Sequence, residues 1–171
     1  MLIYVVAAVG IAIMMYPILK KLNEALALGY VAARTIEGML FTVYVVILLL
    51  LLTLGQEFVK AGTPDASYFQ TGGTLLLAAS DWAFSLGLGI IFALSALILN
   101  YLLFQSKLVP RWLSGWCFIG AALVFAITLL EYFGISLTML LNLPIALQEM
   151  AFALWLIVKG FNSSAIASGS A

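Results

Sequence analysis

Histidine is absent from this chain of 171 residues, and cysteine occurs only once, as Cys117. Without histidine there is no Ser-His-Asp triad, no imidazole metal site and no imidazole haem ligand. A lone cysteine excludes an internal disulfide and a cysteine cluster for zinc or iron–sulfur. No glycine-rich phosphate loop or intramembrane-protease motif is present either. The sequence therefore gives no support for an enzyme, and we predict no catalytic residue, no metal site and no cofactor.

Charge is also scarce, because seven Lys or Arg and seven Asp or Glu together make up only 8% of the residues. A soluble domain is about a quarter charged. Apolar residues make up 65% of the chain, which is enough for five membrane spans of about 20 residues each. This composition excludes a soluble globular protein, a disordered chain and a sizeable extramembrane domain. We predict an all-α fold, a polytopic transmembrane bundle of five helices with short loops, whose partner is the lipid bilayer and not nucleic acid.

Five apolar runs indicate where these helices lie. They span about 2–19, 24–55, 75–104 and 112–133, with a fifth run that ends at Lys159. The fifth helix begins either near Asn142, with Pro144 in its first turn, or near Ser136, with a kink at the proline. We expect residues 1–160 to form a single transmembrane domain and the Ser- and Ala-rich residues 161–171 to be a disordered tail.

The second run is the longest, and the most polar stretch of the chain follows it. Asn23 is a suitable N-cap for this helix, with Glu24 in its first turn. The run would span about 46 Å, which exceeds a hydrocarbon core of about 30 Å, so the helix must tilt or project. We predict that residues 56–74 form a loop, because Gly, Pro and Asp recur there, with a short interfacial helix at 65–70.

Basic residues are distributed unevenly between the two ends of the predicted bundle. Only Lys60 falls at one end, whereas the other end holds Lys20, Lys21, Lys107, Arg111 and Lys159. Loops rich in Lys and Arg stay in the cytoplasm. The asymmetry therefore predicts a multi-pass membrane protein with its N-terminus outside and its C-terminus in the cytoplasm, so that Gly62 is outside and Lys107 is inside.

Three charged residues fall deep inside the predicted spans and form a candidate polar or ion site: Arg34, Glu37 and Glu149. A charged side chain inside a span is costly, so each is a functional candidate. Arg34 and Glu149 each lie about 15 Å from the cytoplasmic ends of their helices, and Glu37 lies about one turn deeper. The functional interpretation is a site where Arg34 holds an anion and a carboxylate relays protons. The alternative is a buried structural pair that locks two helices.

A single arginine can neutralise only one of the two deep carboxylates. We predict an ion pair between Arg34 and Glu149, because their depths match and an unpaired arginine at the midplane is costly. Glu37 is the local rival, since residues three apart share a helix face. The carboxylate that is left over would be protonated, paired elsewhere or facing water.

The remaining polar residues have more ordinary interpretations. Asp81 and Glu131 lie near the outer interface, where we expect solvated carboxylates, with a calcium or magnesium site as the alternative. We predict that Asn100 and Gln148 form hydrogen bonds between helices, and that Cys117 is an inert packed thiol.

Several separate motifs resemble those of one family. They are Pro17–Tyr30 followed by Arg34-x-x-Glu37, Leu51–Lys60, Pro64–Gln70, Asp81-Trp82, Gln105–Arg111, Leu143–Met150 and Trp155–Gly160. Over nearly the whole chain they resemble bacterial integral membrane proteins of domain-of-unknown-function family 4386. The resemblance implies a small multi-helix protein of the bacterial inner membrane with no established activity, so no catalytic residue is carried over. The resemblance also implies one further N-terminal helix in relatives, so that this chain would be either a natural short form or a truncated one, and we expect a homo-oligomer or a partner helix at its N-terminal face.

Two functions follow as hypotheses. The first is a bacterial inner-membrane protein of unknown activity that binds or moves a small polar or ionic solute, or protons, through the midplane charged site. The second is a structural or partner-binding membrane subunit whose buried charges only lock helix packing. A water-reachable cavity lined by the midplane charges would favour the first, and a dry, fully paired cluster would favour the second.

Overall fold

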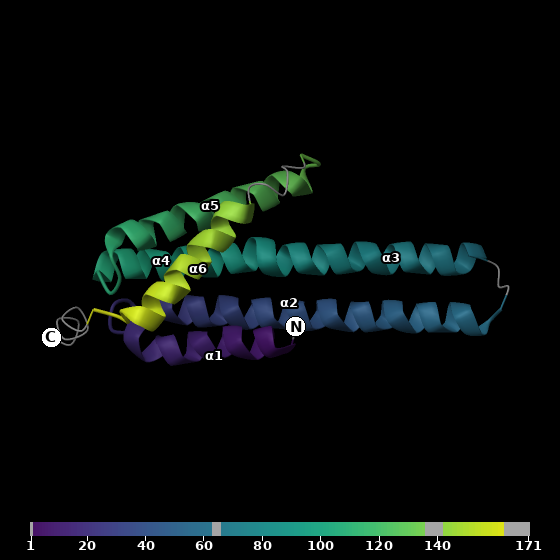
Figure 1. Ribbon diagram of the computed structural model, residues 1–171, viewed down its shortest axis with the longest axis horizontal. Coiled ribbons are helices and arrows are strands. Elements are labelled where there is room, and N and C mark those ends of the chain that lie inside the picture. The colour runs from purple at the N-terminus through teal and green to yellow at the C-terminus, as the bar shows by residue number, and fades with distance from the viewer. Residues whose placement is uncertain (1, 63–65, 136–141, 163–171) are drawn as a thin grey trace.

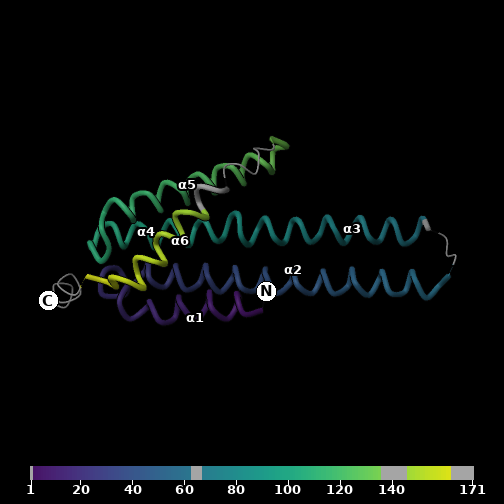
Figure 2. The backbone as a smooth tube through the Cα atoms, viewed as in Figure 1, coloured from purple at the N-terminus to yellow at the C-terminus, as the bar shows by residue number. Residues whose placement is uncertain are grey.

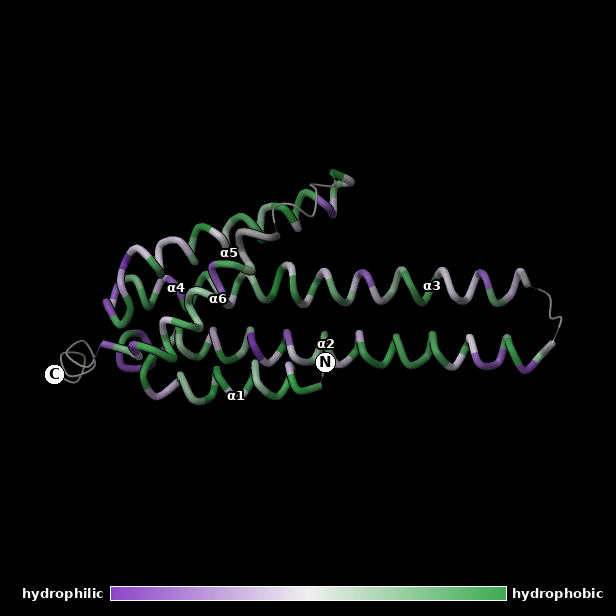
Figure 3. Tube along the Cα trace, in the orientation of Figure 1, coloured by the Kyte–Doolittle hydropathy of each residue, from purple (hydrophilic) through white to green (hydrophobic). Residues whose placement is uncertain are grey.

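The structure is a computed structural model that describes residues 2–62, 66–135 and 142–162. Across these residues every regular element is a helix and no strand occurs, which confirms the predicted all-α fold. Four helices are long and apolar enough to cross a membrane, and Ala146–Val158 is a shorter apolar helix. Figure 3 shows that the helices are mostly hydrophobic, with a hydrophilic interruption partway along α2 (Glu24–Lys60). The chain therefore has the architecture of a multi-pass membrane protein.

The helices follow one another with short connections. They are α1 (Leu2–Leu19), α2 (Glu24–Lys60), α3 (Ala66–Phe84), the π-helical segment η1 (Ser85–Ile91), α4 (Phe92–Ser106), α5 (Arg111–Tyr132) and α6 (Asn142–Val158). Because α3, η1 and α4 continue one another, they form a single long helix, and the described chain contains the five helices that were predicted. The start of α6 at Asn142 is one of the two predicted starts. The predicted tail lies, from residue 163 onward, outside the described residues.

The predicted loop at 56–74 is mostly wrong, because α2 continues to Lys60 and α3 begins at Ala66. The polar residues of this stretch bond along the helices instead of interrupting them. Lys60 forms an ion pair of 2.8 Å with Glu57, and the hydroxyl of Thr71 donates to the carbonyl four residues before it. The predicted interfacial helix is thus the first part of α3, and the chain turns near Gly62, whose φ of +77° suits glycine.

A long antiparallel hairpin organises the bundle. Figure 1 shows α2 running beside the continuous helix formed by α3, η1 and α4, while the shorter helices gather around one half of this pair. The 37 residues of α2 give a length of about 55 Å, so the prediction of an over-long second helix is confirmed. In the projecting half the two helices lie close enough for Gly72 to face the side chain of Leu54.

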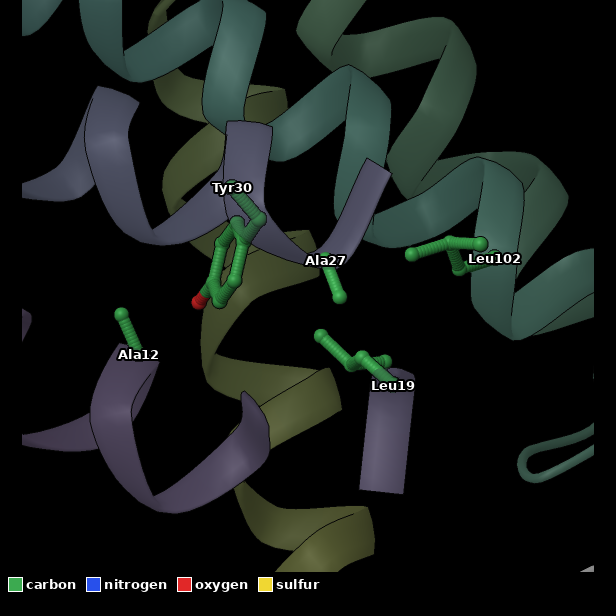
Figure 4. Packing of buried hydrophobic residues seen from close by; sticks show 5 residues of the cluster. All are labelled: Ala12, Leu19, Ala27, Tyr30 and Leu102. Carbon is green, nitrogen blue, oxygen red and sulfur yellow. The ribbon is translucent and has the colours of Figure 1, made fainter. Parts of the chain in front are cut away.

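Small and aromatic residues hold α1, α2 and α4 together. Ala12, Leu19, Ala27, Tyr30 and Leu102 are all at most 2% exposed and form one cluster. Figure 4 shows Tyr30 reaching from α2 towards Ala12 on α1. The start of α2 is fixed as predicted, because the side-chain oxygen of Asn23 accepts a hydrogen bond of 3.0 Å from the Leu26 amide.

A second cluster closes the end of the bundle where three connections meet. Leu103, Leu108 and Val109 are buried there against partly buried residues of α6, including Trp155. Figure 2 shows the α1–α2 connection, the α4–α5 connection and the end of α6 at this same end. These segments carry all the basic residues of the predicted cytoplasmic end, so we call it the basic end.

Candidate polar site inside the bundle

Glu37 lies at the centre of a closed polar cluster between α1 and α2. Its side chain is fully buried and accepts two hydrogen bonds from Nη1 of Arg34, of 3.0 Å to Oε1 and 2.8 Å to Oε2. The hydroxyl of Tyr4 on α1 donates a third hydrogen bond, of 2.6 Å, to Oε1. Beside this cluster, α1 approaches α2 closely, because a Cβ on Gly38 would lie 3.1 Å from Val9. Both the charge and the hydrogen-bonding capacity of Glu37 are therefore largely satisfied.

The predicted ion pair between Arg34 and Glu149 is wrong. Among the described residues, Arg34 forms its ion pair with Glu37, the local rival. Residues three apart on one helix need no tertiary folding to meet, and Tyr4 then fixes the carboxylate from the other side. The guanidinium of Arg34 also lies 5.6 Å from the ring centroid of Phe92 on α4, at cation–π distance.

Arg34 and Glu149 nevertheless share a cavity of about 370 Å³ between α1, α2, α4, α5 and α6. Its apolar wall includes Phe92, Leu99 and Phe152. The residues with polar side chains that line it are Tyr4, Tyr30, Arg34, Ser95, Asn100, Cys117, Gln148 and Glu149. The cavity therefore combines apolar walls with a few polar groups, which is the usual composition of a small-molecule site. We call it the midplane cavity.

Three of the residues that line this cavity carry polar groups without a protein partner in the described chain. The side chain of Glu149 is exposed, and in the described part of the chain it has no ion pair within 4 Å. Two buried atoms of cavity-lining residues, Nε of Arg34 and Oδ1 of Asn100, have no hydrogen-bond partner among the residues that the structure describes. A buried polar atom without a partner costs about 1–3 kcal/mol. The midplane cavity thus offers a donor, an acceptor and a carboxylate that a polar ligand or water could satisfy.

Gln148 fixes α6 against α5 at the wall of the cavity. It is 4% exposed, and its Nε2 donates a hydrogen bond of 3.4 Å to the carbonyl of Cys117. Its amide occupies the space where a Cβ on Gly120 would lie. The prediction that Gln148 bonds between helices is therefore confirmed, and Cys117 is a buried free thiol next to this contact.

Asn100 differs from its prediction. Its Nδ2 donates a hydrogen bond of 2.8 Å to the carbonyl of Ala96, one turn earlier in the same helix. The amide nitrogen is therefore used within α4 and not between helices, while the amide oxygen of this cavity-lining residue has no hydrogen-bond partner among the described residues.

Asp81 and Glu131 both have exposed side chains, in agreement with solvated carboxylates. The residues that follow them pack together, with the rings of Trp82 and Tyr132 at a centroid distance of 5.0 Å. No group of three or more potential metal ligands occurs within the described residues. The interfacial interpretation therefore has the support of exposure, whereas nothing on these two carboxylates supports the calcium or magnesium alternative.

Sequence reasoning missed Tyr4, which gives Glu37 its partner on α1. A depth argument could have found it. Tyr4 lies 15 residues before the end of α1 and Glu37 lies 13 residues after the start of α2, so both side chains lie about 20 Å from the connection between these helices. Phe92 had no such signal, because the π-helical turn before it changes the register of α4.

The fold and this site define the chain as a small multi-pass helical membrane protein with a polar cavity inside its bundle. The sequence model of the family described as Domain of unknown function (DUF4386) matches residues 1–160. The chain therefore belongs to this family, and the resemblance predicted from its motifs is confirmed. No curated protein and no solved structure matches the chain. As a member of this family, it is a membrane protein of unknown activity.

Proposed function

We propose that the protein binds a small polar or ionic solute, or protons, in the midplane cavity, and that Glu149 is the group that meets this ligand. The contrast between two deep carboxylates supports the proposal. Glu37 is fully buried and paired with Arg34 and Tyr4, whereas Glu149 lines the cavity with an exposed side chain. A carboxylate that served only packing would be expected in the first of these two situations.

The charge of the site favours a cationic ligand or a proton over an anion. Arg34 and Glu37 neutralise one another, so the midplane cavity carries one net negative charge whenever Glu149 is ionised. The unpaired oxygen of Asn100 is a second acceptor for a ligand N–H or O–H group. The hypothesis that Arg34 holds an anion loses its support, because Glu37 already neutralises this arginine.

The same site in a bacterial inner membrane would have a defined orientation. The gathering of basic residues at one end supports a cytoplasmic location for that end. In this orientation the N-terminus and Gly62 are outside, the C-terminus is inside, and Glu149 lies about midway through the hydrocarbon core.

The structural function is the second candidate, and one observation favours it. The cluster of Tyr4, Arg34 and Glu37 is closed and joins α1 to α2, as expected for charges that lock helix packing. If all the charges worked in this way, the midplane cavity would be closed to water-soluble ions, and Glu149 would not influence what enters it.

Cys117 provides a test, because it is the sole cysteine and lines the cavity. In membranes, we expect its thiol to react faster with a cationic methanethiosulfonate reagent than with an anionic one, by about tenfold, since Cys117 and Glu149 line the same cavity and a charge even about 10 Å away contributes more than about 1 kcal/mol at intermediate dielectric. The thiolate attacks the sulfenyl sulfur, a mixed disulfide forms and methanesulfinate leaves. We expect Glu149→Gln to abolish this charge preference.

Glu131→Gln is the matched control, since it removes an exposed carboxylate that does not line the cavity. It should leave the preference unchanged. Because Cys117 is 6% exposed, a second reporter, Ala153→Cys with Cys117→Ala, places the thiol at an exposed cavity-lining position. Equal rates with both reagents at both reporters would contradict the proposal and support the structural function.

A further inference from the structure

A second hollow, of about 480 Å³, opens at the basic end of the bundle. Lys107, Arg111 and Lys159 line it together with Trp155 and Phe161. None of its lining residues within the described chain is acidic. We call it the basic groove. It is separate from the midplane cavity, because no residue lines both of them.

The three cations of the basic groove come from two parts of the chain that are far apart in sequence. Lys107 lies in the α4–α5 connection with φ of +58°, Arg111 is the first residue of α5, and Lys159 directly follows α6. All three side chains are exposed. The fold holds this convergence in place, because the amide of Asn162 donates a hydrogen bond of 2.9 Å to the carbonyl of Leu108. Three like charges around one hollow attract a counter-anion.

The start of α5 adds to this positive potential. Its N-cap is Pro110, whose side chain makes no capping hydrogen bond. The first amide groups of a helix point out of its N-terminus, and the helix dipole adds a positive partial charge there. On this 22-residue helix the first turn carries Arg111 as well, so the dipole and the side-chain charges act on the same hollow.

The walls of the groove are mostly apolar and include a residue type that is common at the membrane interface. Trp155 packs edge-on against Trp112 at a centroid distance of 6.2 Å, and tryptophan is enriched at the level of lipid headgroups. Leu108 and Val109, which are buried, line the same groove as the cations. A ligand that combines an anionic phosphate with acyl chains matches both parts of this surface, whereas free phosphate would use only the charges.

From these observations we propose that the basic groove binds the headgroup of an anionic phospholipid. The proposal is independent of the function proposed for the midplane cavity. Lys20 and Lys21 provide the contrast on which the test depends. They lie at the same end of the bundle, but they do not line the groove. Any general effect of basic residues on topology or on lipid attraction should therefore be the same for them as for the groove cations, whereas a specific effect of the groove should not.

Native mass spectrometry of the protein, purified in mild detergent and mixed with equal amounts of phosphatidylglycerol and phosphatidylcholine, tests the proposal. We expect phosphatidylglycerol to be retained preferentially. One Lys or Arg near a membrane surface is worth about fivefold in anionic lipid binding. The triple variant Lys107→Gln/Arg111→Gln/Lys159→Gln should therefore lose the preference by more than tenfold, whereas Lys20→Gln/Lys21→Gln should change it less than twofold.

Two further arms make the outcome decisive. Lys159→Arg, which keeps the charge, should retain the lipid while Lys159→Gln should weaken it several-fold, with unchanged helical content in both variants. An excess of inorganic phosphate should leave the lipid bound. Equal losses in the Lys20/Lys21 and groove variants, no loss in the triple variant, or displacement of the lipid by phosphate would each overturn the proposal.

Discussion

Two carboxylates at similar depth in this bundle occupy opposite surroundings. Glu37 is fully buried and accepts hydrogen bonds from Arg34 and Tyr4, while Glu149 has an exposed side chain on the wall of the midplane cavity. The difference shows that depth in a membrane span does not by itself distinguish a structural charge from a ligand-binding one. What distinguishes them is whether the protein itself supplies the partners.

The largest loss of stability is expected when the paired carboxylate of Glu37 is removed. Glu37→Gln leaves the charge of Arg34 buried without its ion pair, and breaking one side of a buried pair costs about 3–5 kcal/mol. Unfolding in sodium dodecyl sulfate, followed by circular dichroism, should show a loss of this order. Glu149→Gln, within about one helical turn of the same depth, should cost less than about 1 kcal/mol. Similar losses for the two variants would contradict the distinction.

The same measurement sharpens the assignment of the partner of Arg34. Arg34→Met should strand the buried carboxylate of Glu37, so the double variant Arg34→Met/Glu37→Gln should recover part of the lost stability. Arg34→Met/Glu149→Gln should recover none. Recovery in the second double variant alone would reinstate the ion pair that was predicted from sequence.

Removing the hydroxyl that closes the cluster should have a smaller effect. Tyr4→Phe deletes one hydrogen bond to a buried carboxylate, and hydrogen bonds to charged groups contribute about 1.5–3 kcal/mol. Denaturation of this variant should show a loss in that range. Tyr44→Phe is the control, because the rings of Tyr4 and Tyr44 both pack on Phe41, whereas among the described residues only Tyr4 and Arg34 donate side-chain hydrogen bonds to Glu37. An equal loss in both variants would argue that ring packing, and not the hydrogen bond, is responsible.

The wall of the cavity can be changed without touching any charge. Gly120→Ala places a methyl group where the Gln148 amide lies, so the amide must move away and lose its hydrogen bond to the Cys117 carbonyl, at a cost of about 0.5–1.5 kcal/mol. The variant should also increase the reactivity of Cys117, since the α5–α6 contact holds Gln148 beside its carbonyl. Gly115→Ala on the same helix meets only the Phe104 ring at 3.7 Å, an ordinary contact, and should leave stability and reactivity unchanged.

The smallest effect is expected where an ion pair of identical spacing lies outside the bundle. Glu57 and Lys60 are also three residues apart and 2.8 Å from each other, but their side chains are 58% and 69% exposed. Exposed pairs contribute about 0–1 kcal/mol, so Glu57→Gln should shift the unfolding midpoint only slightly. A loss as large as that of Glu37→Gln would show that burial does not set the value of these pairs.

The fold could be predicted largely from composition and hydrophobic runs. Helix α1 and the start of α2 at Asn23 agree with the prediction, because apolar length and capping are local signals. The end of α2 could not be predicted, since Gln, Glu and Lys at 56–60 support a helix as readily as a loop. The π-helical turn at Ser85–Ile91 has no sequence signature of its own.

The residues of the candidate site could be predicted from the sequence, but the ion-pair partner of Arg34 could not. A charged side chain inside a membrane span is costly, and this argument identifies Arg34, Glu37 and Glu149 from the sequence alone. All three lie at or beside one cavity. Depth gave the wrong partner for Arg34, because it ignores rotation about the helix axis. The hydrogen bond from Tyr4 completes the set of partners of the Glu37 carboxylate. This contact exists only when α1 is packed on α2, so the sequence does not reveal it directly.

The central claim is that the carboxylate of Glu37 is buried and paired, whereas that of Glu149 is exposed in the midplane cavity. Both groups can be tested in one sample. Membranes containing the unmodified protein are treated with a water-soluble carbodiimide and glycine ethyl ester, and the amide formed at each glutamate is quantified by peptide mass mapping. We expect modification of Glu149, with the exposed Glu131 as the internal reference, and less than about one-tenth of that modification at Glu37. Equal modification of Glu37 and Glu149, or protection of both, would contradict the account.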